Sequence, residues 1–368
     1  MDTKRLIALL LSVTLLAGTG LAIYLSAVDK IGSDRAQQAA AQAITVRGLI
    51  GSEKEAFFAS PQVVAALARH GITVQVEKVG SRQQALRDDL KKYDFAFPAG
   101  VPAAIKIQQA TGVRESYTTF FTAMAIASWR PLLPVLEANG LSEKSGGYQT
   151  LDMAAYLAMV DKGVRWRDLK ANDSFRIARS VIISSTDART SNSAAMYLAL
   201  ASYSANGMNI LQDPRQADRV APLMTELFLR QGLQERSSAG PFEDYVALGI
   251  GKAPLVMIYE SQFLEFQAAR KTRNPDMVLL YPKPTLFTKH VLVPFTPGGV
   301  RLGELLANDP ELQRLAARQG YRTGNPDLFA AYLKEASLEA PLNLIDVVDP
   351  PTFELLERLI DALDQRMK

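Results

Sequence analysis

Short β-branched segments alternate with helical segments beyond the first 43 residues, and this alternation constrains the fold more than any other feature. Strands are predicted at residues 44–50, 72–79 and 93–98, with helices at residues 60–70 and 81–91 between them. A βαβαβ order is typical of a parallel sheet covered by helices, which binds ligands at the carboxyl ends of its strands. The sequence therefore predicts the α/β fold class.

A long apolar segment at residues 118–129 follows this unit, and we interpret it as a strand that leaves the first lobe. A second block repeats the pattern, with strands predicted at residues 175–183 and 253–259. Strands at residues 277–281 and 290–294 form the return path. Further helices are predicted at residues 151–161, 166–169, 194–202, 262–271, 304–319 and 353–367.

Two lobes are expected because 368 residues exceed what a single core usually fills. We assign residues 44–127 plus 283–368 to lobe I and residues 128–282 to lobe II. The long strand and the return path then supply two crossings between the lobes. No internal repeat is visible, which argues against a solenoid.

The N-terminal segment is predicted to carry an export signal. Residues 6–28 form a run of 23 residues without a charge behind Lys4 and Arg5. That length spans a bilayer, and the two cations keep the N-terminus on the cytoplasmic side. We interpret residues 1–30 as an uncleaved transmembrane anchor in the inner membrane and residues 31–43 as a polar tether. The alternative is a cleaved signal, and both interpretations place the folded part in the periplasm or extracellular space.

Composition excludes several kinds of chemistry. The chain has no cysteine, so thiolate zinc sites, iron–sulfur clusters and cysteine nucleophiles are ruled out. Its two histidines, His70 and His290, lie in no recognisable catalytic motif. A net charge of +3 without long runs of one sign does not favour nucleic-acid binding. We expect no cofactor, no metal and no catalytic residues.

Polar side chains gather where predicted strands end, and these side chains form the candidate ligand site. The candidates are Ser52, Glu53 and Lys54 after the first strand, Ala99 and Gly100 after the third, Ser184, Ser185, Thr186, Asp187, Arg189, Ser191, Asn192 and Ser193 in a Ser/Thr-rich turn, and Tyr259 and Glu260 after a later strand.

The Ser/Thr-rich turn suits an anion, because hydroxyl groups precede the N-terminus of a predicted helix. The alternative is that these residues only cap the helix. Arg189 is expected either to clamp the ligand or to pair with Asp187. Glu53 and Glu260 are expected at the cleft from opposite lobes, which would suit a zwitterion or an organic cation better than a bare oxyanion. Alternatively, Glu53 is a charge in the first turn of a helix, and Glu260 is a rim residue hydrogen-bonded across the lobes.

In this order, these segments resemble the type 2 periplasmic solute-binding proteins, and they are similar to the molybdate- and phosphate-type branch. The likeness covers most of residues 44–329. It is carried by the loop at residues 51–54, the crossing strand near residues 120–128, the turn at residues 184–193, Tyr259-Glu260-Ser261, and the helix from Glu311 that ends before Tyr321. The resemblance implies two α/β lobes joined by two hinge crossings, which close over a ligand. The apparent membrane tether departs from the family pattern.

The expected function is therefore that of a membrane-tethered, extracytoplasmic solute-binding protein with a monomeric outer part. It would capture a small polar or anionic solute in the cleft for a transporter or a signalling partner, without catalysing a reaction. Two alternatives remain open at this point. One is an assembly protein with a vestigial cleft, and the other is an enzyme that uses Glu53 and Glu260 as its titratable pair.

Overall fold

The computed structural model describes residues 43–173, 175–232, 234, 239–269 and 274–367. Within these residues no helix combines the length and the apolar character needed to cross a membrane. The predicted anchor at residues 1–30 and most of the tether lie outside the described residues.

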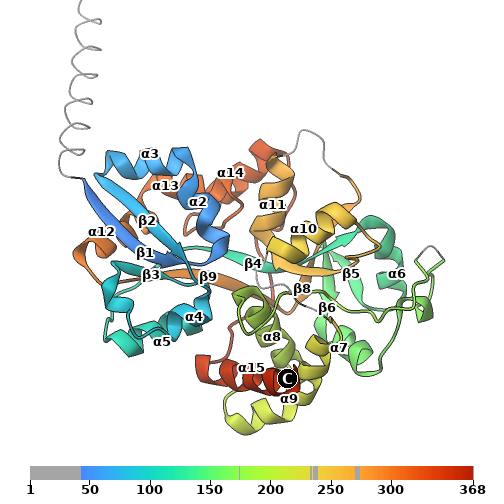
Figure 1. Cartoon of the computed structure of the whole chain (residues 1–368). Coiled ribbons are helices and arrows are strands. Elements are labelled where there is room, and N and C mark those ends of the chain that lie inside the picture. Colours follow the sequence, from blue (N-terminus) through green and yellow to red (C-terminus); the bar gives the residue numbers. More distant parts are fainter. Residues whose placement is uncertain (1–42, 174, 233, 235–238, 270–273, 368) are drawn as a thin grey trace, which may run out of the picture.

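The first group of strands confirms the predicted βαβαβ unit. Strand β1 (Ile44–Ile50) lies between β2 (Ile72–Lys78) and β3 (Phe95–Phe97) and runs parallel to both. Helices cover both faces (Figure 1), and the alternation of side chains along the strands supplies an apolar core to each. The helices that follow these strands are α2 (Glu55–Ala59), α3 (Pro61–Arg69), α4 (Ser81–Ala85) and α5 (Val101–Thr111).

Strand β4 (Tyr117–Trp129) is the longest strand, and it joins two groups of strands. Its first half pairs with β9 (Thr285–Pro294), which in turn pairs with β3. Its second half pairs with β7 (Val256–Tyr259) and β8 (Met277–Lys283). The predicted crossing strand and the predicted return path are therefore neighbours in one mixed sheet, and Figure 1 shows them running between its two ends.

The second group of strands is covered by the largest core. Beyond β8 the sheet continues through β6 (Tyr148–Asp152) to the edge strand β5 (Ser142–Ser145). Two buried phenols within this core, Tyr156 and Tyr197, bind each other across 3.0 Å. The helices of this part are α6 (Leu133–Ala138), α7 (Met153–Asp161), α8 (Asn192–Ala205), α9 (Pro214–Leu229), α10 (Ala239–Leu248) and α11 (Glu260–Ala269).

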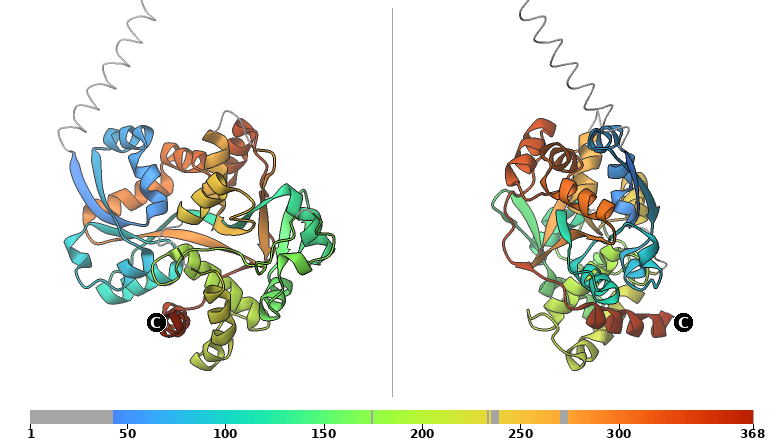
Figure 2. Two further views of the ribbon diagram at one scale, coloured as in Figure 1. Left: turned by 45° about the vertical axis from the view of Figure 1, so that its right-hand side comes forward. Right: turned by 90° about the vertical axis from the view of Figure 1, so that its left-hand side faces the viewer.

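The C-terminal part returns to the first group and then leaves it again. Helices α12 (Pro297–Asn308), α13 (Pro310–Arg318) and α14 (Pro326–Ala336) are followed by the short strand β10 (Val347–Val348) beside β9. The last helix, α15 (Phe353–Met367), packs mainly against α9 and α8, next to which Figure 2 shows it. We expected residues 283–368 to belong to lobe I, whereas this helix shares the core of the second group.

Three predicted elements differ from the structure. Residues 175–183 form no strand, because their backbone bonds go to residues 164–167, as in Val181 N–H to the Val164 carbonyl, without a continuous ladder. The helix predicted at residues 81–91 ends at Ala85. The helix predicted at residues 304–319 is two helices, since Pro310 cannot continue α12 and the Asp309 carboxylate accepts the Glu311 and Leu312 N–H groups that begin α13.

Candidate functional site

A cavity of about 250 Å³ lies between the ends of β1 and β2 on one side and the start of α8 with the end of β7 on the other. Its position matches the general rule that open α/β sheets bind ligands beyond the carboxyl ends of their strands. The lining residues are Gly51, Ser52, Glu53, Lys78, Val79, Gly80, Ser81, Gln83, Thr190, Ser191, Asn192 and Tyr259.

Glycines let the two sides of this cavity approach closely. A Cβ atom on Gly80 would lie 2.6 Å from the carbonyl oxygen of Thr190, closer than a carbon can come. Gly100 has a φ of +95°, and a Cβ atom there would lie 3.1 Å from Oδ1 of Asn192. The loops after β2 and β3 therefore touch the segment that begins α8, so the two sides of the cavity are in contact at these points.

The start of α8 offers hydrogen-bond donors to the cavity. Ser191 precedes the helix, but its hydroxyl bonds the Ser193 hydroxyl at 3.0 Å rather than a backbone N–H of the first turn. The capping role that we considered for Ser191 is therefore not the one its side chain performs. Asn192 donates from Nδ2 to the Tyr259 hydroxyl at 3.1 Å and fixes both side chains at the wall. A helix of this length favours negative charge or a carbonyl oxygen at its N-terminus.

Behind Glu53 lies a buried cluster of charged and aromatic groups. The Lys54 ammonium donates to the Glu53 carboxylate and to His290 Nδ1, the latter at 3.0 Å. Burial lowers the pKa of Lys54, although the Glu53 charge opposes this effect. Burial also lowers the pKa of His290 well below 6.5, and the Lys54 charge adds to it. The fully buried Lys54 thus binds the Glu53 carboxylate on the side away from the cavity.

We predict that folding stability falls as the pH drops below about 6.5, because unfolded His290 gains a proton that the folded protein excludes. A group with a depressed folded pKa contributes stability above its unfolded pKa and loses it on acidification. The expected slope approaches about 1.4 kcal/mol per pH unit between roughly pH 6.5 and pH 5. In urea unfolding, the free energy of unfolding of His290→Gln should depend less steeply on pH over this range. The His70→Gln control should keep the pH dependence of the unchanged protein. A His290→Gln profile parallel to that of the unchanged protein would contradict this prediction.

The other residues of the Ser/Thr-rich turn have partners away from the cavity. Ser184 lines a different cavity beside Arg179 and Arg230. The N–H and hydroxyl groups of Ser185 both donate to Gln231 Oε1, at 2.8 and 2.9 Å. Thr186 and Ser193 share a hydrogen bond of 3.0 Å between their hydroxyls.

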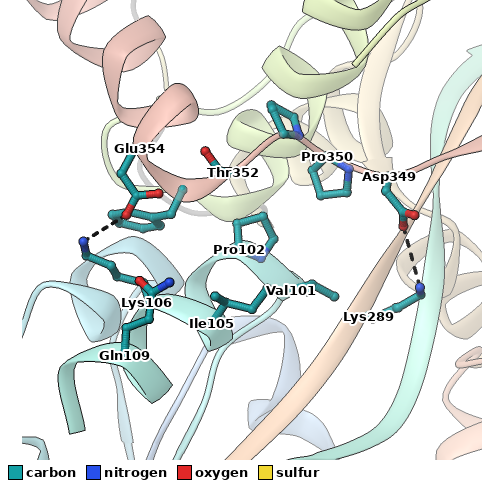
Figure 3. Close-up of a pocket in the computed structure, with 12 residues that line it drawn as sticks. Val101, Pro102, Ile105, Lys106, Gln109, Lys289, Asp349, Pro350, Thr352 and Glu354 are labelled. Carbon is teal, nitrogen blue, oxygen red and sulfur yellow. Dashed lines mark hydrogen bonds and ion pairs between the residues drawn. The ribbon is translucent and has the colours of Figure 1, made fainter. Parts of the chain in front are cut away.

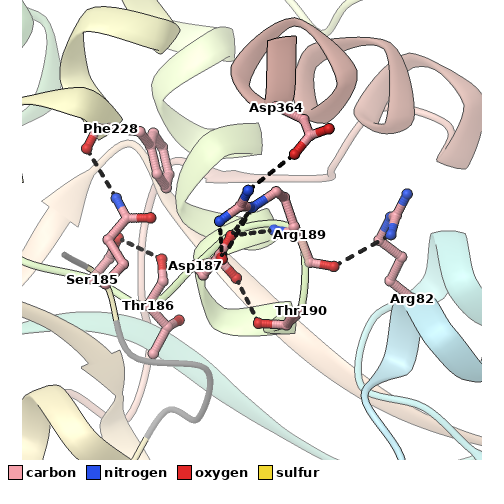
Figure 4. A network of polar contacts seen from close by, with 9 residues as sticks. Arg82, Ser185, Thr186, Asp187, Arg189, Thr190, Phe228 and Asp364 are labelled. Carbon is pink, nitrogen blue, oxygen red and sulfur yellow. Dashed lines mark hydrogen bonds and ion pairs between the residues drawn. The ribbon is translucent and has the colours of Figure 1, made fainter. Parts of the chain in front are cut away.

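Arg189 is an internal ion-pair partner in this structure. Its guanidinium donates to both carboxylate oxygens of Asp187 and also to Asp364 of α15, the latter at 3.0 Å (Figure 4). Of the two roles considered for Arg189, pairing with Asp187 is the one that the geometry shows.

Glu260 lies deep in the fold rather than at the cavity. Its carboxylate accepts two hydrogen bonds from the Arg322 guanidinium, at 2.7 and 2.8 Å, and one from the Tyr281 hydroxyl at 2.7 Å. Because these partners occupy the carboxylate, Glu260 does not face the cavity with Glu53.

Five predicted residues line the cavity and three lie directly behind it. Ser52, Glu53, Ser191, Asn192 and Tyr259 form part of the wall, and Lys54, Ala99 and Gly100 support it. The Ala99 N–H donates to the Ser81 hydroxyl at 2.9 Å. The sequence interpretation missed the wall formed by residues 78–81 and Gln83. The same rule, that ligands sit at strand ends, would have found it after the predicted strand at residues 72–79.

A second hollow of about 390 Å³ lies outside the cleft, between α5 and residues 349–354 (Figure 3). Val101, Pro102 and Ile105 form its apolar floor. Lys106 binds Glu354 at 3.0 Å at one end, and Lys289 lies 3.7 Å from Asp349 at the other. No residue that lines the cleft cavity also lines this hollow.

Comparison with known proteins identifies the fold. No family model matches the sequence, and no curated protein matches it. Among solved structures, iron-bound HitA from Pseudomonas aeruginosa is similar with a TM-score of 0.56 at 11% identity, over 88% of this chain and 98% of that one. A periplasmic thiamin binding protein gives 0.54 at 10% identity, over 89% and 97% of the two chains.

The ferric binding protein from Campylobacter jejuni gives a TM-score of 0.51 at 10% identity, over 88% of this chain and 97% of that one. Structural similarity at such low sequence identity establishes the architecture alone. What this chain binds has to be inferred from its own residues. The described part of the chain has the α/β fold of the two-lobed type 2 periplasmic solute-binding proteins, as the sequence resemblance implied.

Proposed function

We propose that this protein captures a small polar or anionic solute in the cavity between the ends of β1 and β2 and the start of α8. The solute would be passed to a transporter or a signalling partner outside the cell membrane. The observation that carries this proposal is the convergence of Ser52, Gly80, Asn192 and Tyr259 from four separated segments around one cavity of about 250 Å³. A few placed polar groups in a concave site are typical of small-molecule recognition.

The two lobes in this proposal are residues 44–127 plus 283–352 and residues 128–282 plus α15. We move α15 because most of its apolar side chains share the core of α8 and α9, although Phe353 at its start packs in the core of the first group of strands. Strands β4 and β9 are the proposed hinge crossings, since they pair with each other and also with strands at both ends of the sheet. Closure about them would cover the solute.

The positions of the Glu53 and Glu260 carboxylates favour binding over catalysis. An enzyme on this scaffold needs a pair of titratable groups that face one substrate. Glu53 borders the cavity, whereas Glu260 is held by Arg322 and Tyr281 elsewhere. The fold relatives with TM-scores above 0.5 are also described as binding proteins or by their bound iron.

A thermal-shift screen of the detergent-solubilised full chain tests the proposal. Oxyanions, amino acids, sugars and polyamines should be compared at equal ionic strength. A solute that binds only the folded state at about 100 times its Kd adds roughly 2.7 kcal/mol of stability, which corresponds to a midpoint shift of roughly 3–5 °C. We expect one class to produce this shift. Equal midpoints with all four classes would count against solute capture.

We also propose that residues 1–30 anchor the protein, and we predict that the mature chain keeps them. The reason is the uncharged run at residues 6–28 behind two cations. Mass spectrometry of the purified protein should find an intact N-terminus, and the protein should sediment with membranes. A control in which residues 1–30 are replaced by a cleavable export signal should be released into the soluble fraction. A native N-terminus near residue 28 or 44 would exclude the anchor while leaving export intact.

A further inference from the structure

The last helix, α15, packs most of its apolar side chains on one side of the molecule, whereas Phe353 in its first turn lies in the core of the first group of strands. Leu355, Leu356, Leu359, Ile360 and Leu363 are buried in the core that contains α8 and α9. Arg358 adds a bidentate ion pair to Asp218 of α9, at 2.6 and 2.7 Å. Since α8 carries one wall of the cavity, α15 belongs to that half of the proposed cleft.

Two acidic side chains of α15 reach the opposite half. Glu357 accepts two hydrogen bonds from Arg82, Nε to Oε1 at 2.6 Å and Nη2 to Oε2 at 2.7 Å. Glu354 accepts one from Lys106 of α5 at 3.0 Å, as Figure 3 shows. The Arg82 and Glu357 side chains are only 27% and 19% exposed, so water and salt screen this pair less than a surface pair. The bidentate arrangement is the strongest geometry available to such a pair.

Arg82 also connects directly to the cavity wall. It belongs to α4, between Ser81 and Gln83, which both line the cavity. Its Nη1 donates to the carbonyl oxygen of Arg189 at 3.3 Å, and Figure 4 shows this contact beside the pair of Arg189 with Asp364. One guanidinium therefore joins the loop after β2, the segment before α8, and α15.

We propose that α15 is a latch, in which the Arg82–Glu357 pair, supported by Lys106–Glu354, holds the two lobes closed over the solute cavity. Arg82 and Glu357 are then positioning residues that set the affinity for the solute without lining its cavity. The inference rests on the proposed function only in that closure covers the solute. The contacts of the latch itself involve no ligand atom.

The latch has a quantitative consequence for binding. For a solute that needs the closed form, the apparent Kd equals the intrinsic Kd divided by the fraction of molecules that are closed. Weakening the latch must therefore raise the apparent Kd by the factor by which it lowers the closed population. Neutralising Glu357 should lower the closed-to-open ratio roughly fivefold, as expected for one partly shielded ion pair.

The chain has no cysteine, so two introduced cysteines are the only reactive thiols and can be labelled selectively. Spin labels at Val64→Cys on α3 and Asp161→Cys at the end of α7 would report the distance between the halves in the full chain in detergent. Both positions are exposed. Without added solute, we expect Glu357→Gln and Arg82→Glu to move the distribution towards longer distances. The charge swap Arg82→Glu with Glu357→Arg should restore the shorter distance.

Asp218→Asn is the matched control. It weakens the bidentate pair between Arg358 of α15 and Asp218 of α9, which involves no residue of the opposite half. Circular dichroism of every variant verifies folding. Distances in Glu357→Gln equal to those in Asp218→Asn, or a charge swap that restores nothing, would overturn the latch. A failed solute screen would overturn the proposed function and leave these distances unaffected, so the two failures are distinguishable.

Discussion

Replacing Arg322 with leucine should lower the free energy of unfolding by about 3–5 kcal/mol, because it leaves the Glu260 carboxylate charged and buried. The Glu260 side chain is fully buried and the Arg322 side chain is 6% exposed. The guanidinium also donates to the carbonyl oxygens of Leu342 and Pro341, at 2.9 and 2.6 Å, and lies 4.2 Å from the centre of the Phe329 ring. One side chain thus joins α11, α14 and the segment before β10.

Urea unfolding followed by circular dichroism measures this effect. The matched control is Arg318→Leu, since Arg318 pairs at 3.0 Å with Glu335 and both side chains are largely exposed. An exposed pair contributes about 1 kcal/mol or less, so the control should unfold nearly as the unchanged protein does. The double variant Glu260→Leu with Arg322→Leu should recover part of the loss, because no buried charge remains. A loss below about 1 kcal/mol in Arg322→Leu would show that water reaches the carboxylate.

Replacing Gly80 with valine should weaken solute binding by about tenfold to a hundredfold while the protein stays folded. The backbone of Gly80 has φ −57° and ψ 145°, which any residue adopts, so the effect comes from contact alone. The new Cβ would collide with the Thr190 carbonyl oxygen across the cleft. An overpacked contact of this kind destabilises the closed arrangement by roughly 1–3 kcal/mol. Opening the cleft removes the contact, and the same free energy then weakens solute binding.

Calorimetric titration with a solute identified by thermal shift measures the loss. Gly251→Val is the control, since a Cβ atom at Gly251 meets no atom within 4 Å. The expected pattern is unchanged binding in Gly251→Val and weakened binding in Gly80→Val, with similar melting temperatures in the absence of solute. Full affinity in Gly80→Val would mean that the solute binds without closure at this point.

The local pattern of the sequence was sufficient to predict many of the elements. The strand predicted at residues 44–50 has the bounds of β1, and the helix predicted at residues 353–367 has those of α15. Both segments have a clear period of apolar residues or a dense β-branched composition. The segment at residues 175–183 has a similar composition but no continuous partner strand, and composition does not reveal the absence of a partner.

The candidate site was predicted only in part, because its composition depends on contacts between distant residues. Strand ends were recognisable, and of the residues selected on that basis Ser52, Glu53, Asn192 and Tyr259 border one cavity. Glu260 has the same local pattern, yet its partner Arg322 lies 62 residues further along the chain. A strand-end carboxylate is therefore a site residue or a core residue depending on a contact that local periodicity does not encode.

Hydrogen exchange of the full chain, with and without the solute that gives the largest thermal shift, tests the central claim most directly. If the solute occupies the cleft, slowed exchange should concentrate at residues 51–54, 79–83 and 190–193, which come from both halves of the molecule. Protection confined to residues 101–109 and 349–354 would instead place the solute in the outer hollow beside α5. That result would contradict the assignment of the cleft as the solute site.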